Sequence, residues 1–101
     1  MRYVYLIRGN DGRYKIGIAK DPSQRIKQLQ TANPDKLEII ETYYSENASK
    51  IESSLHYQYS YARQEGEWFD LSVAEEGDFM DKCKQIDYSI LALQCMGNPF
   101  L

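Results

Sequence analysis

Residues 3–18 read YVYLIRGNDGRYKIGI, and this stretch decides the fold. It contains two runs, residues 3–7 and 13–18, that are rich in β-branched and aromatic residues. Such a composition is typical of β-strands. The residues between the runs include two glycines, an asparagine and an aspartate, which tolerate the backbone angles of tight turns. The pattern therefore predicts an antiparallel hairpin.

The two faces of this hairpin differ in chemistry, because successive side chains of a strand point to opposite faces. One face is mostly apolar and carries Val4, Leu6, Tyr14, Ile16 and Ile18. The other face carries phenol and cationic groups, together with a glycine: Tyr3, Tyr5, Arg13, Lys15 and Gly17. We expect the first face to pack in the core and the second to face solvent, where it would hold a phosphate group.

A helix is predicted to follow the hairpin from Pro22 to about Thr31. Asp21 is a residue type that is favoured at the N-cap, and Pro22 suits the first helical position. Gln24 is placed to hydrogen-bond back to the cap residue. This helix brings Arg25 close to the cationic face of the hairpin, and it ends before Asn33 and Pro34.

The rest of the chain alternates in type. Residues 37–43 predict a third strand, and Ser45 or Asn47 would cap a second helix whose apolar stripe covers the sheet. A short strand or extended segment is expected at residues 67–71. A capping box of Ser72 and Glu75 opens a third helix that would run to about Ile86, with Val73, Phe79, Cys83 and Ile86 facing inward.

Glu52 and His56 lie one turn apart on the second predicted helix, so they face the same way. A carboxylate is a ligand that Mg²⁺ prefers, which makes Glu52 a candidate metal ligand, although an ordinary solvated role is the alternative. His56 is the single histidine of the chain. It could form a structural hydrogen bond, or it could contact a phosphate or shuttle a proton. Trp68 and Phe69 are expected to close the core, with base stacking as the alternative for Trp68.

In their order and spacing, several short motifs together resemble the GIY-YIG nuclease superfamily. They are Tyr3-Val4-Tyr5, Lys15-Ile16-Gly17, Arg25 eight residues later, the segment Ile51 to His56, and Gly66-Glu67-Trp68-Phe69. The Lys-Ile-Gly and Gly-Glu-Trp-Phe motifs are similar to those of its phage and mobile-element branch. The resemblance covers roughly Arg2 to Leu71.

The resemblance implies a metal-dependent endonuclease that hydrolyses DNA. It assigns Mg²⁺ or Mn²⁺ to Glu52, charge stabilisation to Arg25 and activation or positioning of the attacking water to Tyr5. Lys15, on the same face of the hairpin, is the candidate for the positive charge that would assist Tyr5, and a surface pair of the two without a catalytic role is the alternative. The chain departs from the pattern at Lys15, where many relatives have a tyrosine, and at Leu29, where many have a histidine or tyrosine. A non-catalytic module that binds nucleic acid or protein on the same fold is the alternative function.

The sequence accordingly predicts an α+β fold with a small three-stranded antiparallel sheet flanked by helices and an extra C-terminal helix. Residues 1–72 would form the nuclease-like part, and residues 73–101 a helical extension packed on it. Residues 1–72 carry no net charge, and residues 73–101 carry a net charge of −3. DNA binding is therefore expected to be weak or assisted by a partner.

The remaining features bear on location and partners. No stretch is apolar enough to cross a bilayer, so a cytoplasmic location without a membrane partner is expected. Cys83 and Cys95 lack metal-ligand spacing, and free thiols are favoured over a disulfide. The apolar run at residues 90–93 would pack back on the domain or contact a protein partner or a second copy of the chain.

Overall fold

The computed structural model describes residues 2–95, and these form an α+β fold, as predicted. The elements are β1 (Arg2–Gly9), β2 (Tyr14–Ala19), α1 (Pro22–Thr31), β3 (Leu37–Ser45), α2 (Ala48–Gln58), the 3₁₀ turn η1 (Ser60–Ala62), β4 (Trp68–Phe69) and α3 (Val73–Cys95). The short strand predicted within residues 67–71 is the two-residue β4, and it joins the sheet as a fourth strand where three were predicted. None of the described helices is long and apolar enough to cross a membrane.

The sheet has the strand order β3-β1-β2-β4, and every neighbouring pair is antiparallel. The predicted hairpin is confirmed: Tyr5 faces Gly17 across β1 and β2, and Leu6 faces Ile16. Gly12 closes the turn with a positive φ of 85°, which glycine adopts without steric cost. Strand β4 pairs only with Tyr14 and Lys15, so the rest of β2 is a free edge.

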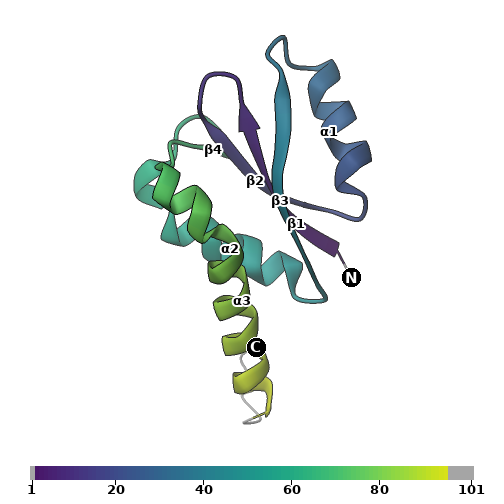
Figure 1. Ribbon diagram of the computed structural model, residues 1–101. Helices are drawn as coiled ribbons and strands as arrows, with labels where there is room; N and C mark the ends of the chain where they lie inside the picture. Colours follow the sequence, from purple (N-terminus) through teal and green to yellow (C-terminus); the bar gives the residue numbers. More distant parts are fainter. Residues whose placement is uncertain (1, 96–101) are drawn as a thin grey trace.

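Helices cover the sheet on both faces, with α1 on one face and α2 and α3 on the other (Figure 1). The main core lies under α2 and α3 and includes the predicted apolar residues Val4, Leu6, Tyr14 and Ile16. A second, small core lies under α1, where Ile26 and Leu29 pack toward Tyr5, Ile7 and Leu37.

The small core corrects one expectation about the hairpin. The face with Tyr5 was predicted to face solvent, yet Tyr5 is only 2% exposed and Lys15 is also buried. The reason is that α1 packs Ile26 and Leu29 against the cluster that contains Tyr5, while Lys15 lies against Trp68 and pairs with Glu67. The bodies of Tyr and Lys side chains are apolar enough to be buried in this way.

Both predicted ends of α1 are confirmed. The predicted capping interactions at the starts of the helices are confirmed in part. Asp21 accepts a hydrogen bond from the Gln24 backbone N–H at 3.3 Å, but the second side-chain contact comes from Ser23 and not from Gln24. The capping box of Ser72 and Glu75 forms in both directions, at 2.8 and 3.1 Å. Asn47 precedes α2 without capping it, because its side chain donates to Asp87.

Helix α3 is longer than predicted, since it runs to Cys95 and not to Ile86. Its inward residues continue to Ile90, which is buried in the main core with Phe79 and Cys83. Val73 was expected to face inward but is 82% exposed, because it starts the helix before α3 reaches the core. Within residues 90–93, Ile90 packs back on the domain while Leu91 and Leu93 remain exposed.

The cysteine prediction is answered for one residue. Cys83 is a free, buried thiol, and burial together with the nearby Asp87 charge raises its pKa to about 12. It therefore stays protonated and is a packing residue. The side chain of Cys95 and residues 96–101 lie outside the described part of the chain.

Two carboxylates on α3 tie this helix to the sheet. Glu76 accepts hydrogen bonds from the Tyr14 hydroxyl at 2.7 Å and from Arg8 at 3.3 Å. Asp87 accepts three hydrogen bonds from the region where β3 leads into α2, and the donors are Tyr43, Ser45 and Asn47. Helix α3 is thus held near both ends of the sheet.

The pairing of Tyr5 with Gly17 gives the first prediction. A Cβ at Gly17 would lie within 2.5 Å of the Tyr5 ring carbon Cζ, so Gly17→Ala must displace the ring. We expect the substitution to lower the free energy of unfolding by about 2–3 kcal/mol, as overpacking of a core does. Urea unfolding followed by circular dichroism measures the change.

Gly77→Ala is the matched control, because Gly77 lies within α3 with no atom within 4 Å of its Cβ position. This substitution should stabilise the protein by up to about 1 kcal/mol through helix propensity. Equal effects of the two substitutions would contradict the packing argument.

Candidate functional site

The sequence-predicted site residues come from three layers of the fold. Tyr5 and Lys15 lie on the sheet face under α1, while Glu52 and His56 come from α2 on the opposite face. The free edge of β2 is the place where the two faces meet. The geometry of each side chain toward this edge decides which residues act together.

Tyr5 is buried, with 2% of its surface exposed, and its hydroxyl lies over Gly17. Gly17 faces Tyr5 across β1 and β2, and the lack of a side chain at Gly17 leaves the space that the phenol oxygen occupies. The fold therefore places the phenol oxygen against the stretch of β2 that β4 does not pair.

Lys15 is held by a residue that the sequence did not single out. Its ammonium donates to Glu67 Oε2 at 2.9 Å and lies 5.8 Å from the centre of the Trp68 ring. The strand register places Lys15 opposite Ile7 and not opposite Tyr5, so it is diagonal to Tyr5 on the same face. The hydrogen bond from Lys15 lowers the pKa of the Glu67 carboxyl.

His56 has a structural contact in the present geometry. Its Nε2 lies 2.8 Å from the Ile16 backbone oxygen, just beyond the last β2 residue that β4 pairs. A carbonyl only accepts, so Nε2 carries the hydrogen and donates it. The ring also packs at 5.1 Å from Phe69. His56 thus fastens α2 to the free edge of β2 and sets the position of Glu52 one turn earlier.

Glu52 is partly buried, and this burial raises the pKa of its carboxyl above the ordinary value. The positive fields of His56, Lys15 and Arg2 act on it in the opposite direction, and the Glu67 charge adds to the rise. Glu52, His56, Lys15 and Glu67 are therefore electrostatic neighbours, although they come from different elements.

The donor set around Glu52 suits an open magnesium site. Within residues 2–95 no group of three or more His, Cys, Asp or Glu side chains is placed to hold a metal. Mg²⁺ commonly uses one or two carboxylates and completes its shell with water and phosphate oxygens. Burial makes ionisation of the Glu52 carboxyl costly, and a bound cation would offset this cost by stabilising the carboxylate. Glu52 therefore fits the role of a magnesium ligand.

Arg25 lies apart from this group. It is partly exposed on α1, and its guanidinium donates to Gln28 at 3.3 Å. No hydrogen bond or ion pair within the described chain joins Arg25 to Tyr5, Lys15 or Glu52. The charges of His56, Lys15 and Glu67 thus act on the Glu52 carboxyl, whereas Arg25 lies on α1 and bonds to Gln28.

Trp68 and Phe69 close the two cores, as the sequence predicted. Phe69 is buried in the main core and Trp68 packs against the small core, one on each face of β4. Glu67, immediately before them, was missed as a site residue because nothing in its local sequence shows that it pairs with Lys15, 52 residues away.

The raised pKa of Glu52 gives a prediction about stability. The folded state holds this proton more tightly than the unfolded state, so stability falls as the pH rises from about 4.5 through the folded pKa. Glu52→Gln removes this cost. We expect the variant to gain stability relative to the wild type as the pH rises from 4 to 7, measured by thermal melting. A difference that stays constant with pH would contradict the argument.

The comparison with protein families gives one match, to the T5orf172 domain, over residues 2–84. No curated protein and no solved structure matches the chain. The T5orf172 domain is a phage-associated domain of a type linked to endonucleases. Because the match covers the whole sheet, α1, α2 and the first half of α3, the chain belongs to the T5orf172 domain family.

Proposed function

We propose that the chain is a metal-dependent endonuclease of the GIY-YIG type that hydrolyses phosphodiester bonds in DNA of a phage or mobile element. The observation that carries the proposal is that the charges of His56, Lys15 and Glu67 act on the Glu52 carboxyl, next to the stretch of β2 where His56 bonds to Ile16 and Tyr5 faces Gly17. The nuclease-related family and the resemblance of the motifs support the same function.

Each residue has a role that its surroundings support. Glu52 would hold Mg²⁺ or Mn²⁺, which when bound polarises the phosphate and stabilises the leaving oxygen. Tyr5 would position the attacking water through its hydroxyl, which lies over Gly17. Lys15 would bind the phosphate, and His56 keeps Glu52 in place through its bond to the β2 edge.

Arg25 would offset the charge that develops on the phosphate. Its bond to Gln28 is long and exposed, so the guanidinium is free to turn toward a DNA backbone that approaches over α1. Nine basic and six acidic residues lie in the first 50 positions, which is a modest positive surface. Sequence specificity would therefore come from a partner or from DNA structure.

The proposal predicts nicking of supercoiled plasmid with Mg²⁺ or Mn²⁺ and none with chelator. Arg25→Ala should slow nicking roughly 100-fold, the usual cost of removing one group that stabilises transition-state charge. Glu52→Gln should abolish nicking while the protein stays folded. Tyr5→Phe tests the hydroxyl without removing the buried ring.

Lys84→Ala is the control for loss of a positive charge, because Lys84 is exposed on α3, away from the β2 edge. It should nick at the wild-type rate. Nicking that survives in Glu52→Gln would exclude the proposed metal ligand, and plasmid that stays intact with the wild type would favour a binding module.

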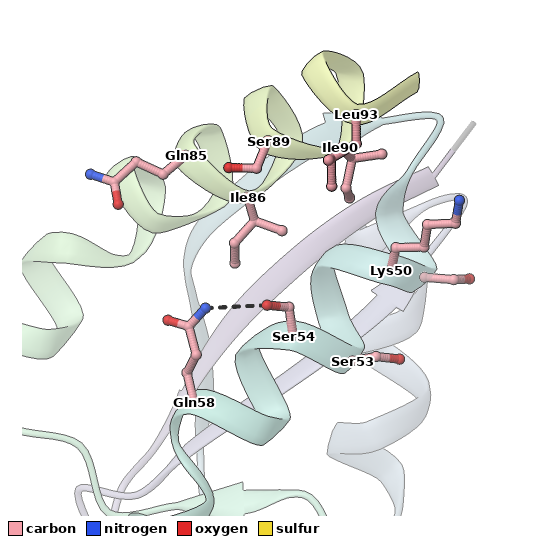
Figure 2. A pocket seen from close by; sticks show the side chains of 10 residues that line it. Lys50, Ser53, Ser54, Gln58, Gln85, Ile86, Ser89, Ile90 and Leu93 are labelled. Carbon is pink, nitrogen blue, oxygen red and sulfur yellow. Dashed lines mark hydrogen bonds between the residues drawn. The ribbon is translucent and has the colours of Figure 1, made fainter. Parts of the chain in front are cut away.

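A binding module is the second candidate, and a groove between α2 and α3 favours it. The groove has a volume of about 710 Å³ and is lined by side chains of both helices, with Ile86, Ile90 and Leu93 on the α3 side (Figure 2). Ser54 and Gln58 form a hydrogen bond on the α2 side. Among the described residues that line the groove, Lys50 is the one that carries a charge, which suits a protein partner or a second copy of the chain better than DNA.

Self-association through this groove makes a separate prediction. Leu93 is partly exposed at the end of the groove, so Leu93→Glu should convert a dimer to a monomer without lowering the melting temperature. Sedimentation velocity measures the change. Tyr88→Glu, an exposed residue of α3 outside the groove, is the control, and a wild type that sediments as a monomer would exclude the second copy.

A further inference from the structure

Lys15 and Glu67 form an ion pair whose two members differ in exposure. The Lys15 side chain is 11% exposed and the Glu67 side chain is 47% exposed. Lys15 is therefore the fixed member, enclosed between the sheet and Trp68. Glu67 approaches it from the solvent side and is the member that another anion can replace.

The backbone around Glu67 allows this exchange. Gly66 has a positive φ of 60°, and the loop is closed by hydrogen bonds from Trp68 N to Glu65 O and from Gln64 N to Trp68 O, at 3.1 and 2.8 Å. None of these bonds involves the Glu67 side chain. A rotation of that side chain therefore frees the ammonium while strand β4 stays paired.

We propose that Glu67 is an internal competitor, whose carboxylate occupies the Lys15 ammonium in the free protein and is displaced by a backbone phosphate of nucleic acid. Both groups are oxyanions that accept hydrogen bonds from an ammonium, so one can take the place of the other. The choice of nucleic acid as the source of the phosphate rests on the proposed function. The exchange itself depends only on the ion pair.

The exchange also changes the charge at the β2 edge. With Glu67 in place, the Lys15 charge is balanced and the edge is less attractive to DNA. After exchange, the Lys15 charge is free to bind the phosphate beside the Trp68 ring, 5.8 Å from its centre, while the neighbouring Arg13 stays paired with Asp11 at 2.7 Å. Glu67 thus weakens binding of a phosphate at Lys15 until the carboxylate is displaced.

Trp68 supplies the measurement, because it is the single tryptophan and lies against Lys15. Its fluorescence is recorded while the protein is titrated with a short single-stranded oligonucleotide, and separately with inorganic phosphate, both in chelator. Without metal there is no cleavage, so the readout is independent of nuclease activity. Thermal melting confirms that each variant is folded.

The variants are Glu67→Gln and, as a matched control, Glu65→Gln. Glu65 is exposed in the same loop, and its side chain makes no ion pair or hydrogen bond within the described residues. Glu67→Gln should bind the oligonucleotide about five-fold more tightly than the wild type. A gain of this size is expected when one partly exposed ion pair no longer competes with the ligand. Glu65→Gln should change the affinity less than two-fold, the small effect of an exposed unpaired charge.

Both substitutions are repeated in a Lys15→Met background. In this background the gain in affinity from Glu67→Gln should fall to the small gain from Glu65→Gln, because Glu67 and the phosphate no longer have an ammonium to compete for. An affinity of Glu67→Gln equal to or weaker than that of Glu65→Gln would overturn the proposal. So would a gain that persists without Lys15, or a Trp68 signal that responds to neither ligand.

The outcomes separate this proposal from the proposed function. Tighter binding by Glu67→Gln together with an intact plasmid in the nicking assay would support the role of Glu67 as a competitor and contradict the proposed nuclease activity. A gain with inorganic phosphate but not with the oligonucleotide would overturn nucleic acid as the source of the phosphate.

Discussion

Burial of β1 on both of its faces is the constraint on which the rest of the structure depends. Val4 and Leu6 lie in the main core, Tyr5 and Ile7 lie in the small core, and none of the four is more than 2% exposed. Burying a side chain of this size contributes about 2 kcal/mol, so neither face can be left open. A helix on one side and two on the other follow from this requirement (Figure 1).

Coverage of both faces leaves the sheet edges as the places where backbone and polar groups remain accessible. Beyond Lys15, no strand of the described chain pairs with the outer side of β2, and His56 supplies the hydrogen bond that a strand would have given to Ile16. Gly17 lies on this same stretch and leaves room for the Tyr5 hydroxyl. His56 of α2 and the hydroxyl of Tyr5 therefore both reach β2 where no described strand pairs with its outer side.

The fold was predictable from sequence where the signal is local. The hairpin turn around Gly12, the limits of α1 and the capping box of Ser72 depend on residues close in the chain. The small core was not predicted, because the polar tip of Tyr5 hid the apolar body that α1 buries. The Lys15–Glu67 pair was beyond reach, since it joins residues far apart in sequence through a two-residue strand.

The two departures from the GIY-YIG pattern have different physical consequences. Leu29 packs in the small core, so the position four residues after Arg25 helps to bury the Tyr5 ring and offers no group to a phosphate. A lysine at position 15 brings a charge that cannot be enclosed without a counter-ion, which a tyrosine would not require. Glu67 provides that counter-ion. Lys15 and Glu67 are therefore best regarded as one chemical unit, in which the lysine supplies the charge and the glutamate determines when it is available.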